Sequence, residues 1–109
     1  MAAWRTKAYA LFGFEPGSYS SARGKVDLFA DLVGMARRAL AGGDEELLGR
    51  IAGYVTWAAR QPSEGLASAV DLAFFLPVFR DAALCAGLRG RVPEDLFSDK
   101  WQALMESPA

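Results

Sequence analysis

Apolar residues recur every three or four positions along most of this chain, which is the period of a helix. In the segment 25–41, polar residues such as Asp27, Asp31 and Arg38 fall on the side opposite the apolar stripe. The predicted core stripe of this segment is Val26, Phe29, Val33, Ala36 and Leu40. The segment after it has a similar stripe of Leu47, Leu48, Ile51, Val55 and Ala58. No segment shows the convincing alternation of a half-buried strand.

Capping residues mark where the central helices begin and end. Gly42-Gly43 is expected to end the helix over 25–41, because glycine is common just past a helix C-terminus. Asp44 is then a good N-cap for the next helix, which Gln61-Pro62 ends. Ser63 is the predicted N-cap of a further helix that runs to about residue 76.

Prolines mark the later boundaries. Pro77 is expected to break or restart the chain, since its ring clashes with the preceding turn of a helix. A short helix then runs to Leu88, and Pro93 suits the first turn of a last helix over about 94–106. A first helix over about 2–12 completes the set.

These elements predict an all-α protein. The 109 residues, of which 52% are hydrophobic, are expected to form one compact domain over 1–109. Its five to six short amphipathic helices would pack as an antiparallel bundle or as a helical-hairpin array. The loop at about 13–24 is the longest connection, and Phe14 and Tyr19 are expected to pin it to the core.

A weak internal similarity has an offset of 44 residues. Val26-Asp27-Leu28 recurs as Val70-Asp71-Leu72, and this spacing is within the range of two-helix repeats. Helices of similar composition also match by chance, so the sequence leaves both interpretations open.

The chain offers little of the chemistry that enzymes use. It has no histidine and a single cysteine, which excludes serine–histidine and cysteine–histidine catalysis and an intrachain disulfide. Cys85 is expected to be a small buried apolar residue. Asp27 and Asp31 share one helix face and could form an acid–base pair, but a solvated charged face is the better interpretation. We therefore expect no enzyme, no metal and no cofactor.

Charge and hydropathy limit the choice of partners. The net charge is −1, so the chain lacks the excess of basic residues that favours binding to the phosphates of nucleic acid. No apolar run approaches the roughly 20 residues of a transmembrane helix. A cytoplasmic protein that binds neither nucleic acid nor membrane is expected.

The helix that begins after Asp44 carries the candidate binding residues. Trp57 falls about 140° from the centre of the core stripe, on the side of Arg50, Gly53 and Tyr54. Tryptophan, tyrosine and arginine are the residues enriched in binding hot spots, and Gly53 allows close approach of another element. The alternative is that a second helix of this protein covers them.

Phe74 and Phe75 form a second candidate. They are expected to plug the core near a helix end, or else to line a small apolar pocket with Asp71 or Asp81 as its polar contact.

The stretch from Asp44 to Phe75 resembles a family of small bacterial helical proteins of unknown function. The matching features are the acidic helix start, Tyr54 and Trp57 three residues apart, and apolar steps at Ala69-Val70 and Ala73-Phe74-Phe75. That family commonly continues with an acid, a histidine and a leucine, where this chain has Leu76-Pro77-Val78. The resemblance implies the helical fold and supplies no activity.

Three functions follow as expectations. The first is a non-catalytic protein-binding module of an immunity or regulatory kind, which uses Arg50, Gly53, Tyr54 and Trp57. The second is a structural homo-oligomer that uses the same face on itself. The third is a small ligand-binding protein or enzyme with a pocket near Phe74 and Phe75.

Overall fold

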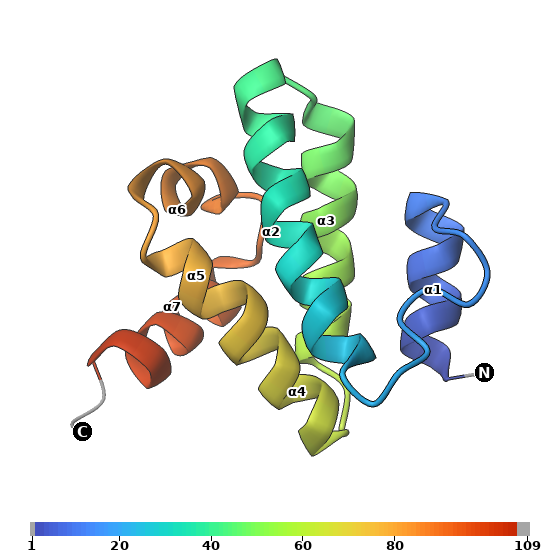
Figure 1. Cartoon of the computed structure of the whole chain (residues 1–109). Helices are drawn as coiled ribbons and strands as arrows, with labels where there is room; N and C mark the ends of the chain where they lie inside the picture. Colours follow the sequence, from blue (N-terminus) through green and yellow to red (C-terminus); the bar gives the residue numbers. More distant parts are fainter. Residues whose placement is uncertain (1, 107–109) are drawn as a thin grey trace.

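The computed structural model describes residues 2–106, and the fold over this range is all-α, as predicted (Figure 1). The α-helices are α1 (Ala3–Phe12), α2 (Gly24–Gly42), α3 (Glu45–Ala59), α4 (Glu64–Val70), α5 (Leu76–Phe79), α6 (Ala82–Leu88) and α7 (Glu94–Trp101). Two π-helical segments are η1 (Asp71–Phe75), between α4 and α5, and η2 (Gln102–Glu106), after α7. The buried apolar residues of these elements form one core.

Helices α2 and α3 form a hairpin at the centre of the molecule (Figure 1). Helix α1 packs against α3, and the α4–η1–α5 helix crosses α2 on the other side. Helix α6 packs against both α5 and α2, and α7 lies beside α5. Consequently α2 is covered on two sides, whereas α3 keeps one long face exposed.

The capping residues read from the sequence act as predicted. The backbone N–H of Leu47 donates to Asp44 Oδ1 at 3.1 Å, and that of Leu66 donates to Ser63 Oγ at 3.3 Å. Gly43 ends α2 with a φ of 70°, a conformation that side chains disfavour. Pro93 lies at the N-cap position of α7, just before the first turn in which it was expected.

Of the two alternatives predicted for Pro77, the break is wrong, whereas the restart has support because Pro77 lies in the first turn of α5. The chain stays helical from α4 through η1 to the end of α5, because η1 widens the helix one turn before the proline. The Leu76 N–H donates to the carbonyl of Asp71, five residues back instead of four. This extra residue lets the helix pass Pro77, which has no N–H to give. The helix ends at Arg80, and Asp81 caps α6 through the Leu84 N–H at 3.2 Å.

The core stripe predicted for α2 is only partly right. Phe29, Val33 and Ala36 are buried, but Val26 is 41% exposed and Leu28 is fully buried. Since α3 and η1 pack on different sides of α2, its buried side is wider than one stripe.

The same positions bear on the internal similarity. Val26 is exposed whereas its counterpart Val70 is buried, and Leu28 is buried whereas Leu72 is 62% exposed. The two segments therefore bury different sides, and the similarity at offset 44 does not extend to their packing.

The loop before α2 is held in place, as predicted, by Phe14 and Tyr19. Both aromatic rings pack against the core, 5.1 Å apart. The Tyr19 hydroxyl donates to Asp31 Oδ2 at 2.6 Å, and the Tyr9 hydroxyl donates to the carbonyl of Ser18. This loop passes directly over Gly24, the first residue of α2.

Candidate functional site

One long side of α3 faces solvent, and we call it the outer face of α3. It consists of Glu46, Gly49, Arg50, Gly53, Trp57 and Arg60, the last of which is the C-cap of the helix. At 100° per residue, these six positions fall within about 60° of Gly53, opposite the buried Ile51 and Val55. Arg50, Gly53 and Trp57 were predicted as binding residues, and the structure brings all three to this face.

Tyr54 does not belong to this face. Its side chain is completely buried, and its hydroxyl donates to the backbone carbonyl of Trp4 at 2.7 Å. Its ring stacks on Phe29 and meets the edge of Phe12, with centroids 5.8 and 5.7 Å away. Helix α1 therefore covers Tyr54, as the alternative interpretation of the sequence had it.

Burial also changes the acidity of Tyr54. Desolvation raises the pKa of its phenol well above the ordinary value near 10, since the charged phenolate would lose its water. The pKa of Tyr19 is raised too, first by desolvation and then by its bond to Asp31.

The raised pKa of Tyr54 predicts that the protein loses stability in alkali. A phenol that ionises less readily when folded contributes its full stability below about pH 10, and this contribution falls as pH rises above that value. Tyr54→Phe should remove this part of the pH dependence, at the cost of one hydrogen bond at neutral pH. Urea unfolding at about pH 8 and about pH 11 measures it. Equal losses in the two proteins at alkaline pH would contradict the prediction.

Trp57 lies at the border between the core and the outer face of α3. It is half-buried, and its ring stacks on Tyr54 with centroids 5.9 Å apart. The Nζ of Lys7, from α1, lies 5.2 Å from the ring centroid. Such an indole, held between Tyr54 and Lys7 and still partly exposed, has the position of a rigid anchor for a partner.

Two glycines leave the middle of the outer face without side chains. A Cβ atom added to Gly49 or Gly53 would meet nothing within 4 Å, and neither residue has a positive φ. Glycine inside a helix costs about 1 kcal/mol relative to alanine. Within the described part of the chain, neither packing nor backbone conformation requires glycine at these two positions. Gly49 was not among the predicted binding residues, although its four-residue spacing from Gly53 was the available signal.

The charges of the outer face are only loosely engaged. Glu46 and Arg50 form an ion pair one turn apart, and Arg60 lies 3.9 Å from Asp95. The exposed fractions of these four side chains run from 50% to 80%. Exposed pairs of this kind contribute about 0–1 kcal/mol, so they exchange readily for a partner's charges.

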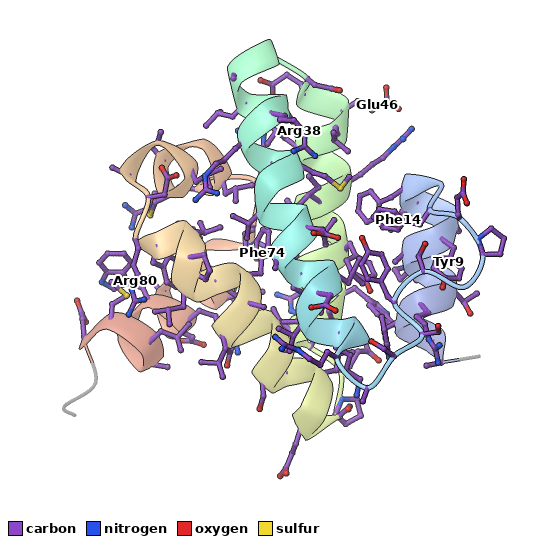
Figure 2. All side chains as sticks on the ribbon, in the orientation of Figure 1. Tyr9, Phe14, Arg38, Glu46, Phe74 and Arg80 are labelled. Carbon is purple, nitrogen blue, oxygen red and sulfur yellow. The ribbon has the colours of Figure 1, made fainter. Side chains whose placement is uncertain are left out.

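Phe74 and Phe75 do not form a pocket. Both are buried, and Figure 2 shows Phe74 between α2 and the α4–α5 helix. Neither ring lines any of the main hollows on the described surface. Asp71 pairs with Lys100 at 2.8 Å, and Asp81 caps α6 and pairs with Arg37 at 3.1 Å. The two aromatics are the core plug that was the first interpretation of this segment.

An open hollow lies instead between α6 and the α7–η2 helix. Its lining includes Phe79, Cys85, Arg89 and Trp101. Cys85 is half-buried: it packs against the core and also takes part in this lining, so the prediction of a small buried apolar residue is only partly right. The reason is that η2 packs on α5, and Phe97 and Trp101 of α7 contact Phe79 of α5, which leaves this side of α6 open.

Other chemistry has little support over residues 2–106. Asp27 and Asp31 are exposed, and Asp31 accepts the bond from Tyr19. No group of three or more cysteine, aspartate or glutamate residues in this range is placed to hold a metal ion. Within the same range no helix has the length and apolar character to cross a membrane.

Comparison with known proteins finds no relative of this chain. No protein-family model, no curated protein and no solved structure matches the chain. The resemblance of the segment 44–75 to a bacterial family therefore stays a prediction.

Proposed function

We propose that this protein is a non-catalytic protein-binding module and that the outer face of α3 is its docking surface. The observation that carries the proposal is the pair Gly49 and Gly53, which keeps an exposed helix bare where alanine would favour folding. A bare helix backbone is suited to the close approach of another helix. Trp57 stands at the edge of this strip as a large, pre-positioned contact.

We propose an immunity or regulatory role in which the module acts by occupying a partner, since the outer face holds no nucleophile paired with a base. The cytoplasm is the proposed setting, supported by an unpaired cysteine at position 85.

Affinity capture from native lysate tests the docking surface. Gly53→Arg should abolish capture of a stoichiometric partner, because it places a long side chain at the centre of the bare strip, while arginine fits an exposed helix well. Glu64→Arg, at an exposed position in the first turn of α4, is the matched control and should capture as the wild type does. Mass spectrometry identifies the captured chain.

The same variants define the opposite result. Circular dichroism first shows that each remains helical. Equal capture by folded Gly53→Arg and by the control would mean that binding does not involve the outer face of α3. The proposal would then be wrong.

A further inference from the structure

We propose that the occupant of the outer face of α3 is a second copy of this chain, docked α3 against α3 in antiparallel orientation about a two-fold axis at Gly53. The inference rests on the proposed function and names its partner. It is carried by the order of bare, bulky and charged positions along the face.

Gly53 lies at the centre of the outer face in both directions. Glu46 and Arg60 are each seven residues from it, and Gly49 and Trp57 are each four residues from it. In an antiparallel pair centred on Gly53, positions at equal distance on opposite sides come to the same height. Glu46 then lies at the height of Arg60 of the second copy, about 10 Å from the axis on either side.

The bulky and bare positions match in the same way. Trp57 comes to the height of Gly49 of the second copy, so the largest side chain of the face meets a position without one. Gly53 meets its own copy at the axis, where two backbones must pass most closely. Steric fit and charge therefore select one register.

Charge also selects the direction. A parallel pair about a two-fold axis would place Glu46 beside Glu46 and Arg50 beside Arg50 of the second copy, and like charges oppose pairing. The antiparallel pair replaces these contacts with two Glu46–Arg60 contacts. The side chains of Glu46 and Arg60 are 75% and 53% exposed, so both reach a partner without rearrangement of the core.

The contact is small. The fifteen residues of α3 span about 22 Å, so one helix pair buries less surface than a permanent dimer needs. A reversible, concentration-dependent dimer is expected, and sedimentation velocity from low micromolar to near millimolar concentration measures it.

A disulfide trap tests the register. In a Cys85→Ser background, Gly53→Cys should form a covalent dimer under mild oxidation, because the two thiols meet at the axis. Gly49→Cys is the matched control, since its two copies lie about 12 Å apart along the helices, beyond the roughly 7 Å between Cα atoms that a disulfide spans. Non-reducing gel electrophoresis measures the yields, and equal yields would overturn the register.

A charge exchange separates this pairing from a purely structural effect. Glu46→Lys should weaken dimerisation about tenfold, because it places two cations at the same height. Adding Arg60→Glu in the same chain should restore it. Failure of the double variant to recover would overturn the pairing.

The outcomes distinguish the two proposals. The wild-type protein could stay monomeric at every concentration and capture a foreign partner that Gly53→Arg does not capture. This result would overturn the self-docking, but the outer face of α3 would still be the docking surface. A monomer that captures nothing would overturn both.

Discussion

Replacing Tyr54 with alanine is expected to lower the free energy of unfolding by about 3–5 kcal/mol, the range for a large buried aromatic. The ring lies fully buried between α1 and the α2–α3 hairpin, where it contacts Phe29 and Phe12. Its hydroxyl also holds the Trp4 carbonyl. The substitution leaves a cavity and detaches α1 from α3. Urea unfolding followed by circular dichroism measures the loss.

Trp57→Ala is the matched control for this prediction. Trp57 is the larger residue, but it is only half-buried whereas Tyr54 is fully buried. Trp57→Ala should therefore lower the free energy of unfolding by less than half as much as Tyr54→Ala. A loss as large as that of Tyr54→Ala would place Trp57 in the core and remove it from the outer face of α3.

Gly24→Ala is expected to lower the free energy of unfolding by about 3 kcal/mol, which is the upper end of the usual cost of overpacking. A Cβ at Gly24 would lie 1.9 Å from the carbonyl oxygen of Tyr19 and 2.7 Å from its carbon. These are backbone atoms of a loop anchored by the bonds of Tyr19 and Tyr9, so they cannot move aside cheaply. Thermal melting measures the shift.

The same substitution at the bare glycines should have the opposite sign. Gly49→Ala with Gly53→Ala should raise the free energy of unfolding by about 2 kcal/mol, because alanine favours the helix and meets no neighbour. Stabilisation here and destabilisation at Gly24 would show that the two kinds of glycine serve different purposes. A double variant less stable than the wild type would mean that the bare strip serves folding, and the argument for docking would fail.

Much of the fold could be predicted because its signals are local. Asp44 and Ser63 cap the helices that follow them through bonds to residues three positions on, which a sequence displays directly. The effect of Pro77 was harder to predict, because whether a proline interrupts a helix depends on the conformation of the preceding turn. The π-helical segment η1 widens the helix and accommodates Pro77, and no single residue in the sequence predicts such a segment.

The candidate site was harder to predict than the fold, because its exposure depends on packing between segments that are distant in the sequence. The helical period correctly sets Trp57 and Gly53 away from the core stripe. It cannot tell that α1 returns over Tyr54, since that contact joins residues 50 positions apart. Likewise, the exposure of Cys85 depends on where α7 and η2 pass α6.

The central claim is that the outer face of α3 docks another protein chain, and photo-crosslinking in living cells tests it most directly. A photoreactive phenylalanine at position 50, an exposed position of the outer face beside the bare strip, should capture one defined protein, a second copy or a foreign partner, in high yield. The same residue at position 64, exposed on α4, should capture none. No adduct from position 50, or the same adducts from both positions, would contradict the account.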